Sequence, residues 1–407
     1  MRNLDRLYSD RAGKMRKSVI RELLKVTQDP EIISFAGGLP NPDSFPMDNL
    51  DEAIQSVMKN YGKIALQYGT TPGVKELREI ITERASKEGV NTNPDDVVIT
   101  SGSQQALDTV GKLFLNPGDM AIVGSPTYLG GINAFRSYEC NLTGIPLDKD
   151  GMQVDLLEDA IKRLLKEEMV PKFIYTIPNF QNPAGVIMPE SRRKKLIEIA
   201  NEYDLIIVED DPYGKLRYDA PPIKPIKAFD DEGRVIYIST FSKILAPGFR
   251  LAWTIASDEI SRKIIICKQA LDLCTNTFSQ FIAFEFIRMG FLDLHIMSIC
   301  EMYKPKRDIM MSSMKKYFPE GYVCHKPKGG MFAWATLQED IDTEIMFLDA
   351  IKEKVAYVHG KAFYVDGGGA NSMRLNFSYS TNEQIDEGMK RLGNVIREKV
   401  EKKKVVV

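Results

Sequence analysis

The middle of the chain alternates short apolar runs with segments of helical periodicity. The runs are rich in Val, Ile and Tyr, which is typical of buried strands. The segments between them have the apolar spacing of helices that pack on one face. This alternation predicts an α/β fold with a mainly parallel sheet and helices on both faces. The expected strands lie at 97–100, 120–128, 140–148, 172–185 (running into a polar loop), 204–214, 234–238 and 251–256, with helices between them at 106–115, 155–166 and 191–203.

The two ends of the chain predict further parts. Near the N-terminus, Ser18 is the expected N-cap of a helix at 18–28, which Asp29-Pro30 ends. Towards the C-terminus, a long helical stretch that contains Pro305 and two apolar strands indicates a smaller α+β part. We therefore expect an N-terminal arm and helix at 1–45 that packs with the small domain, a large domain at 46–295 and a small domain at 296–407, with further helices at 48–60, 74–86 and 292–317 and a strand at 373–378.

Small and polar residues follow several of the expected strands. In parallel sheets the ligand binds beyond the carboxyl ends of the strands. The stretch SGSQQ at 101–105 follows a buried strand and opens a helix, an arrangement that holds phosphate on helix N-terminal amides. It matches neither G-x-G-x-x-G nor G-x-x-x-x-G-K-[ST], so nicotinamide and ATP chemistry gain no support. The strand ends together collect Gly102, Ser103, Gln104, Tyr128, Asn182, Asp210, Tyr213 and Lys243.

The stretch STFSKILAPGFR at 239–250 carries the most specific candidate chemistry. It holds Lys243 among hydroxyl side chains, and the Pro247-Gly248 turn can bring Arg250 back towards the lysine. A lysine beside another cation has its ammonium form disfavoured, so it can act as an amine nucleophile near neutral pH. Hydroxyls and a guanidinium suit a phosphate dianion. These features suggest a lysine that forms a Schiff base with pyridoxal phosphate; from this stretch alone, a solvated lysine beside a structural arginine is the alternative.

Composition and charge narrow the class of protein. The chain has 407 residues and a net charge of −2, so no global field attracts nucleic acid or an anionic membrane. The five cysteines include no C-x-x-C pair and the three histidines show no ligand spacing, so no metal site is expected. The N-terminus lacks the apolar core of a signal peptide, and no run approaches the ~20 apolar residues of a membrane span, so we expect a cytoplasmic protein.

A series of motifs follows one another in an order that resembles a known family. They are SGSQQ, SPTY, QNPAG, VEDDPYG, STFSK, PGFR and MRLNFS. Together they are similar to the fold-type I, pyridoxal-phosphate-dependent class I/II aminotransferases, and the resemblance covers almost the whole chain. The stretches IRELLK, SFAGGLPNPDSFP and LQYGTTPG are most similar to the 2-aminoadipate and kynurenine-type aminotransferases. The resemblance implies a large domain on a seven-stranded, mainly parallel sheet, a smaller α+β domain, and pyridoxal 5'-phosphate as cofactor.

The resemblance also implies a role for each candidate residue. Lys243 would carry the cofactor as a Schiff base and then move the proton between the substrate α-carbon and the cofactor. Asp210 would pair with the ring nitrogen and keep the ring an electron sink. Asn182 and Tyr213 would bind the ring hydroxyl, and Tyr128 would stack on the ring. The phosphate would be bound by Ser103, Gln104, Thr240 (where the family commonly has serine), Ser242 and Arg250, and by Tyr68 of the neighbouring subunit in a homodimer with shared sites.

Substrate binding is implied at a second group of residues. Arg374 would grip the substrate α-carboxylate, helped by Asn182, and Gly38 would let the backbone lie against the substrate. Arg21 would meet an acidic side chain; a solvated helix charge is the alternative. The implied reaction is a ping-pong transamination with 2-oxoglutarate as acceptor and with 2-aminoadipate, glutamate, aromatic amino acids or kynurenine as donors.

Two other functions stay open at this point. The same lysine and aspartate would serve a pyridoxal-phosphate-dependent lyase or decarboxylase, although Arg374 and Arg21 favour an exchange between two acids. A pyridoxal-phosphate-sensing transcription regulator would carry a winged-helix domain before this fold, and only about thirty residues precede the SFAGG stretch.

Overall fold

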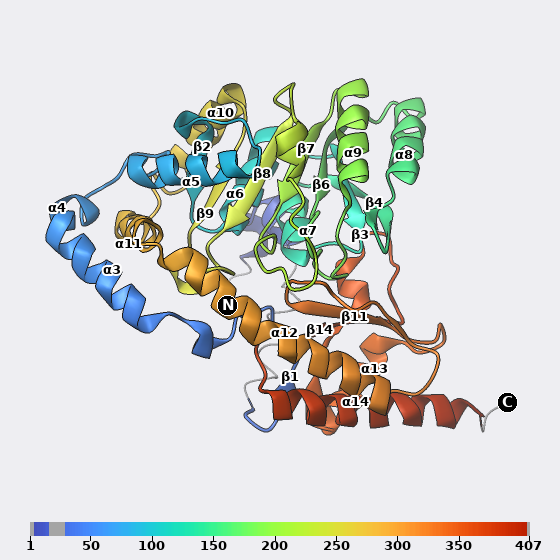
Figure 1. Ribbon diagram of the computed structural model, residues 1–407. Coiled ribbons are helices and arrows are strands. Elements are labelled where there is room, and N and C mark those ends of the chain that lie inside the picture. The colour runs from blue at the N-terminus through green and yellow to red at the C-terminus, as the bar shows by residue number, and fades with distance from the viewer. Residues whose placement is uncertain (1–3, 16–28, 405–407) are drawn as a thin grey trace.

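The computed structural model describes residues 4–15 and 29–404. Its largest element is an eight-stranded sheet in the upper half of Figure 1, with the order β2-β9-β8-β7-β6-β3-β4-β5. β9 runs antiparallel to β2 and β8, β5 runs antiparallel to β4, and the other neighbours are parallel. The strands are β2 (Val97–Thr100), β3 (Met120–Ser125), β4 (Asn141–Asp148), β5 (Gly151–Met152), β6 (Pro171–Thr176), β7 (Ile206–Asp210), β8 (Val235–Thr240) and β9 (Ala252–Ile255).

Helices cover both faces of this sheet and the lower part of the molecule (Figure 1). They are α1 (Asp10–Lys14), α3 (Met47–Asn60), α4 (Gly62–Ala65), α5 (Lys75–Lys87), α6 (Ser103–Phe114), α7 (Leu129–Arg136), α8 (Val154–Lys166), α9 (Glu190–Glu202), α10 (Asp258–Gln269), α11 (Thr277–Arg288), α12 (Phe291–Tyr317), α13 (Thr343–Lys352) and α14 (Asn382–Lys404). Pro305 lies inside α12, so the long helical stretch continues through the proline.

Side chains of the central strands alternate between two helical layers. Ile122 of β3 and Ile207 of β7 belong to a core with α8 and α9. Their neighbours Val123 and Val208 belong to a core with α6 and α7. Because successive strand residues point to opposite faces, burying both faces requires nearly continuous apolar runs. This requirement explains why the central strands of the sequence are apolar throughout rather than alternating.

A second, four-stranded antiparallel sheet lies below the first, with the order β10-β11-β14-β13 (Figure 1). α12 and α14 pack against each other in this lower part. Its strands are β10 (Val323–Cys324), β11 (Phe332–Thr336), β13 (Val358–His359) and β14 (Ser372–Asn376), with β1 (Ile33–Ser34) and β12 (Val355–Ala356) as a separate parallel pair. The β1–β12 pair joins residues near the N-terminus to the C-terminal part.

The predicted α/β fold, with a large, mainly parallel sheet and a smaller α+β part, is confirmed. The large sheet has one strand more than the expected seven, because the two-residue β5 turns back on β4. α6 begins at Ser103 rather than at 106, because Gly102, with φ 84°, acts as its N-cap. The predicted boundary at 295/296 falls inside α12, and the division into domains stays a prediction. The expected helix at 18–28 lies outside the described residues.

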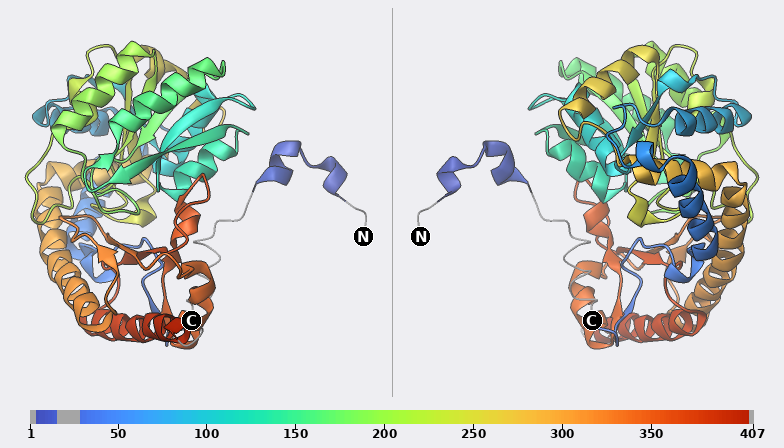
Figure 2. Two further views of the ribbon diagram at one scale, coloured as in Figure 1. Left: turned by 90° about the vertical axis from the view of Figure 1, so that its right-hand side faces the viewer. Right: turned by 90° about the vertical axis from the view of Figure 1, so that its left-hand side faces the viewer.

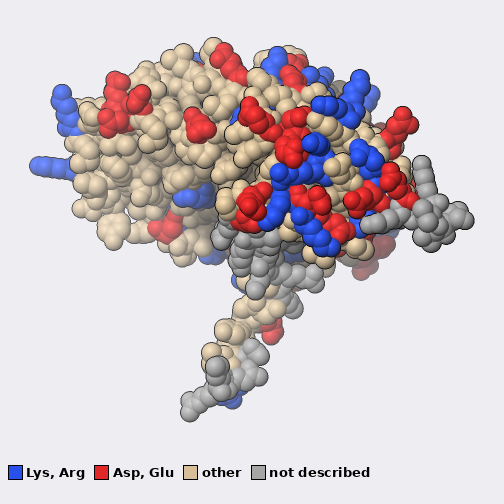
Figure 3. Space-filling view, turned by 90° about the horizontal axis from the view of Figure 1, so that it is seen from below, with Lys and Arg blue, Asp and Glu red and all other residues tan. Residues whose placement is uncertain are grey.

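The surface shows how the ends and charges are arranged. The described residues 4–15 reach to one side of the molecule (Figure 2), where Arg11 lies 5.4 Å from the centroid of the Tyr138 ring. On the face seen from below, acidic and basic side chains are interspersed (Figure 3). All five cysteines are free thiols. Within residues 4–15 and 29–404, no helix combines the length and apolar composition that crossing a membrane requires.

Candidate active site

One cavity of about 600 Å³ collects the residues at the strand ends. β7 and β8 contribute Asp210 and Thr240 from their last positions, and the smaller sheet contributes Phe332 and Arg374. The cavity therefore lies where the carboxyl ends of the large sheet meet the small sheet. The predicted residues that line it are Gly38, Ser103, Gln104, Tyr128, Asn182, Asp210, Tyr213, Thr240, Ser242, Lys243, Arg250 and Arg374.

Lys243 lies half-buried in the wall of this cavity. Its Nζ donates a hydrogen bond to the Gly38 carbonyl oxygen at 2.8 Å. Burial, followed by the nearby Arg374 and Arg250 cations, lowers the pKa of Lys243 to about 8. A useful fraction of the neutral amine is then present near neutral pH, as a nucleophilic lysine requires.

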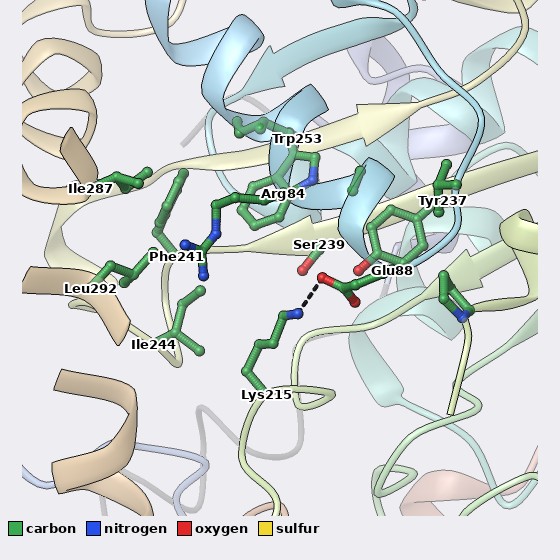
Figure 4. A pocket seen from close by; sticks show the side chains of 14 residues that line it. Arg84, Glu88, Lys215, Tyr237, Ser239, Phe241, Ile244, Trp253, Ile287 and Leu292 are labelled. Atoms are coloured by element: carbon green, nitrogen blue, oxygen red, sulfur yellow. Dashed lines mark hydrogen bonds and ion pairs between the residues drawn. The ribbon is translucent and has the colours of Figure 1, made fainter. Parts of the chain in front are cut away.

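The loop that carries Lys243 also lines a second, much smaller cavity of about 40 Å³, whose side chains are drawn in Figure 4. Ser239, Phe241 and Ile244 line the small cavity, whereas the residues between them line the large one. Phe241 packs against Trp253, with ring centroids 4.8 Å apart. Because a buried water needs about 10–15 Å³, the small cavity has room for only a few waters. It is packing space behind the lysine loop rather than a ligand site.

Arg250 and the start of α6 form one end of the large cavity. Arg250 has φ 52° and ψ 43°, a left-handed conformation that is uncommon for a residue other than glycine. Its guanidinium lies so close to Gly102 that a Cβ there would come within 2.4 Å of the Arg250 NH2 atom. Ser103 Oγ is buried without a hydrogen-bond partner. A cation, a helix N-terminus and an unsatisfied hydroxyl together form an anion site.

Two further hydroxyl and amide groups are held in place at this end. Thr240 Oγ1 accepts a hydrogen bond from the backbone N–H of Ser242 and lies within hydrogen-bond distance of the Leu251 carbonyl, both at 3.0 Å. Thr240 therefore shapes the turn that presents Ser242. Gln104 Nε2 donates to the Gly130 carbonyl at 3.0 Å.

Asp210 is the only one of three consecutive acidic residues that lines the cavity. Tyr175 donates its hydroxyl to Asp210 Oδ2 at 2.8 Å, whereas Oδ1 is buried without a partner. Burial raises the pKa of Asp210 to about 7, a rise that the Tyr175 hydrogen bond opposes. Glu209 and Asp211 form their hydrogen bonds elsewhere, because neighbouring strand residues point to opposite faces. Asp210 Oδ1 is thus available for a cationic N–H group of a ligand.

Arg374 on β14 is a buried cation in the same cavity. Its NH1 donates to Asn182 Oδ1 at 3.0 Å and its NH2 to the Ala36 carbonyl at 2.8 Å, while Nε has no partner. The guanidinium carbon lies 4.3 Å and 5.1 Å from the ring centroids of Phe332 and Phe363. Burial lowers the pKa of Arg374 to about 10, so the side chain is still charged at neutral pH. The two rings fix the orientation of the guanidinium, which suits a carboxylate ligand.

Two predicted site residues are not among the described residues that line the cavity. Tyr68 is 80% exposed and lines a separate cavity of about 320 Å³ together with residues 274–278. Arg21 lies outside the described residues. Tyr128, in contrast, does line the main cavity, and Gly130 makes room for its ring, because a Cβ at that position would lie 2.4 Å from it.

Sequence reasoning missed two contacts in this site. Tyr175 stands in β6 beside β7, and a fully buried tyrosine needs a hydrogen-bond partner, so the neighbouring Asp210 was a recognisable candidate. Phe332 left no such signal, because its contact with Arg374 depends on the pairing of β11 with the distant β14.

Comparison with known proteins identifies the family. Residues 32–392 match the family Aminotransferase class I and II. The chain belongs to this family. It is 51% identical over 399 residues to Aromatic-amino-acid aminotransferase 1 of Thermococcus litoralis, covering 98% of this chain and 96% of the relative. It is 38% identical over 389 residues to the 2-aminoadipate transaminase of Thermus thermophilus, covering 95% of each.

A solved aminotransferase structure shares the whole fold. The crystal structure of Pyrococcus horikoshii kynurenine aminotransferase, in complex with PMP and with KYN and KYA as substrates and products, matches with a TM-score of 0.95 and 50% identity. The match covers 98% of both chains. The protein is therefore a pyridoxal-phosphate-dependent aminotransferase, as the motifs predicted.

The cavity of this aminotransferase fits its cofactor. Asp210 Oδ1, Ser103 Oγ and Arg374 Nε are buried polar atoms without a partner, and all three residues line the cavity that contains Lys243. Buried polar atoms of this kind call for a ligand, because leaving them unpaired costs about 1–3 kcal/mol each. Pyridoxal phosphate with its amino acid brings a ring nitrogen, a phosphate and a carboxylate, one group for each atom.

Proposed function

We propose that the protein transfers the amino group of aromatic, kynurenine-like, 2-aminoadipate or glutamate donors to 2-oxoglutarate in a ping-pong reaction. The observation that carries this proposal is the presence of Lys243 and the unpaired Nε of Arg374 in one cavity. This pair suits an α-amino acid as substrate. The guanidinium can bind its carboxylate, and the amine can act at its α-carbon. The names of the relatives in Thermococcus litoralis, Thermus thermophilus and Pyrococcus horikoshii support these donors.

Lys243 and Asp210 carry the proton and the charge in this proposal. Pyridoxal phosphate supplies an aldehyde that condenses with amines and a ring that withdraws electrons from the α-carbon. Lys243 Nζ holds the cofactor and, when released, moves a proton to and from the α-carbon. Its lowered pKa, about 8, allows Nζ to act as the base. Asp210 Oδ1 holds the ring nitrogen in its protonated form.

The remaining residues orient the cofactor. Asn182 Nδ2 donates to the Tyr213 hydroxyl at 3.4 Å, so the two side chains form one hydrogen-bonding edge for the ring hydroxyl. Tyr128 stacks on the ring. Ser103, Gln104, Thr240, Ser242 and Arg250 would bind the phosphate at the start of α6.

The described part of the cavity offers the substrate side chain an apolar wall. It offers no cation for a second carboxylate of the substrate. Leu39, Ile177 and Phe332 suit aromatic and aliphatic side chains. Among the described lining residues, the cations are Lys243, Arg250 and Arg374, which the cofactor and the α-carboxylate already use. The distal carboxylate of 2-oxoglutarate therefore needs another cation, and we assign that role to Arg21. Gly38 lets the backbone approach the substrate.

We further propose a cytoplasmic homodimer with shared sites. Tyr68 is highly exposed and lies outside the cavity of its own chain, which supports a role at the phosphate of the neighbouring subunit. The nearby Ile64 and Leu66 are exposed apolar side chains, 63% and 70% accessible, that such an interface would bury. The five free thiols suit a reducing compartment.

A half-reaction tests the proposed function. The cofactor-loaded protein is mixed with one donor and no acceptor, and the visible absorption of the cofactor and the released oxo acid are followed. We expect one oxo acid per cofactor, loss of the visible band, and its return on addition of 2-oxoglutarate. The Lys243→Ala protein should give no such burst. Continuous release of ammonia without an acceptor would instead establish a lyase.

The same assay tests the assignment of Arg21. Arg21→Ala should weaken the binding of 2-aminoadipate, glutamate and 2-oxoglutarate by about 10-fold or more, because a charge-assisted hydrogen bond is lost. Aromatic donors should keep their rates. Equal losses for acidic and aromatic donors would contradict a role in recognising the distal carboxylate.

A further inference from the structure

A partly buried polar network lies beside the turn that opens α6, with only Lys268 fully buried. Asp272 Oδ2 accepts hydrogen bonds from Gln105 Nε2 at 2.8 Å and from Ser101 Oγ at 3.0 Å. Lys268 Nζ donates to the same carboxylate at 2.6 Å and 2.8 Å. None of these four side chains lines the cofactor cavity. The network therefore acts on the cavity through the chain at 101–105 rather than by contact.

Asp272 decides how the Gln105 amide is oriented. A carboxylate only accepts hydrogen bonds, so Gln105 must turn its NH2 group towards Asp272. Its Oε1 then accepts the backbone N–H of Ser101 at 2.7 Å and a longer hydrogen bond from Lys268 Nζ at 3.5 Å. Gln105 thus links the backbone N–H of Ser101 to the Asp272 carboxylate through two hydrogen bonds. A flipped amide would lose both bonds at once.

The turn at 101–103, which Gln105 holds, leads directly into the anion site formed by Arg250, the start of α6 and Ser103. Gly102 follows Ser101 with φ 84° and caps α6, and its close contact with the Arg250 guanidinium leaves no room for a Cβ. Ser103 comes next, with Oγ buried and without a partner. A shift of the Ser101 backbone would move the helix N-terminus and Ser103 Oγ relative to Arg250. Because phosphate binding needs several donors in one geometry, this placement matters more than any single bond.

The electrostatics of the network also indicate a positioning role. Lys268 is only 1% exposed, and burial lowers its pKa. Burial alone would raise the pKa of Asp272, but the hydrogen bonds from Lys268, Gln105 and Ser101 outweigh it and hold the pKa below its ordinary value. Buried ion pairs contribute little net stability compared with apolar packing, because desolvation offsets their attraction. A fixed hydrogen-bond geometry is what such a pair provides here.

We propose that Asp272, acting through Gln105, is a positioning residue that holds the 101–103 turn in the form that binds the cofactor phosphate. The inference rests on the proposed placement of the phosphate at Ser103 and Arg250. It adds a residue that touches neither cofactor nor substrate.

The test measures binding to the cofactor-free protein rather than activity. Pyridoxal phosphate and pyridoxal, which lacks the phosphate, are titrated separately and followed by visible absorption. Asp272→Asn removes the charge, and Gln105→Met removes the brace while leaving the Lys268–Asp272 pair. We expect each to raise the dissociation constant of pyridoxal phosphate about 10-fold and that of pyridoxal less than about 2-fold. Asp148→Asn, which breaks the Arg192 pair at 2.6 Å, is the matched control and should leave both constants unchanged.

Thermal unfolding of the cofactor-free proteins separates binding from folding. If Asp272→Asn fails to fold, Gln105→Met decides the outcome. Equal weakening of pyridoxal phosphate and pyridoxal by the deciding variant would show a general structural role and overturn the inference. Arg250→Gln tests the underlying placement of the phosphate: if it leaves the preference for pyridoxal phosphate over pyridoxal intact, the proposed phosphate site is wrong. If Arg250→Gln removes that preference while Asp272→Asn and Gln105→Met keep it, only the inference about Asp272 fails.

Discussion

Asn182 connects Arg374 to Tyr213. Its Oδ1 accepts from Arg374 NH1 at 3.0 Å, and its Nδ2 donates to the Tyr213 hydroxyl at 3.4 Å. All three side chains are buried. The Asn182 amide therefore links the guanidinium proposed to bind the substrate carboxylate to the Tyr213 hydroxyl proposed to bind the cofactor ring. If the proposed roles of these residues hold, one continuous set of hydrogen bonds connects substrate and cofactor.

Replacing Asn182 should weaken substrate binding more than the small size of the asparagine side chain suggests. Asn182→Ala leaves Arg374 without one of its orienting acceptors, so we expect the KM for the donor to rise about 10-fold. Arg374→Lys should have an effect of at least this size, because lysine cannot bind a carboxylate bidentately. The double variant should lose less than the product of the two, since the residues act together. Steady-state kinetics check this, with Asn141→Ala, whose amide donates to the Gly118 carbonyl, as the control.

The lowered pKa of Lys243 predicts a pH-dependent stability of the cofactor-free protein. Lys243 has a pKa of about 8 in the fold, whereas a lysine in the unfolded chain titrates near 10.4. Between these values the unfolded chain binds more protons, so stability from this group rises with pH through the window and is lowest below it. Lys243→Met should therefore raise the melting temperature at pH 7, and this gain should shrink towards about pH 10.

Calorimetry or thermal fluorescence across this range measures the effect. The exposed Lys63, replaced by Met, supplies the baseline for losing a lysine at the surface. A gain from Lys243→Met that stays constant with pH would mean that the charge of Lys243 is not disfavoured in the fold.

Tyr175 should set the acidic limit of activity. Its hydrogen bond at 2.8 Å opposes the rise in the pKa of Asp210, so Tyr175→Phe should raise that pKa further. The carboxylate would then be lost at a higher pH, and the acidic limb of the kcat/KM profile should move towards alkaline pH. We expect about a 5–10-fold loss at pH 6 and a smaller loss at pH 8. Tyr357→Phe is the control, because this buried hydroxyl donates to the Thr343 carbonyl away from the cavity.

Mixed dimers test the shared site. Subunits carrying Tyr68→Ala and subunits carrying Lys243→Ala should each be impaired as homodimers. If Tyr68 serves the neighbouring subunit, a mixed dimer contains one site with both native residues, so the mixture should regain activity. No gain over the separate variants, with exchange of subunits confirmed by mass, would place Tyr68 in the site of its own chain.

Local patterns in the sequence determined much of this protein. Continuous apolar runs placed the central strands, because both faces of a parallel sheet must be buried. The motif order identified the family, and the motif residues Lys243 and Arg250 do line one cavity. Small residues after β2 marked the turn that opens α6, although the exact start at Ser103 depended on the conformation of Gly102.

Only the tertiary structure decided which side chains meet across the site. The hydrogen bond of Tyr175 to Asp210, the stacking of Phe332 on Arg374 and the link of Asp272 to Gln105 all join residues that are distant in the sequence. Periodicity and turn signals report the local backbone, whereas these contacts depend on strand order and on how the two sheets meet. The sequence by itself therefore determined the elements and the chemistry, and the packing of those elements decided the geometry that tunes it.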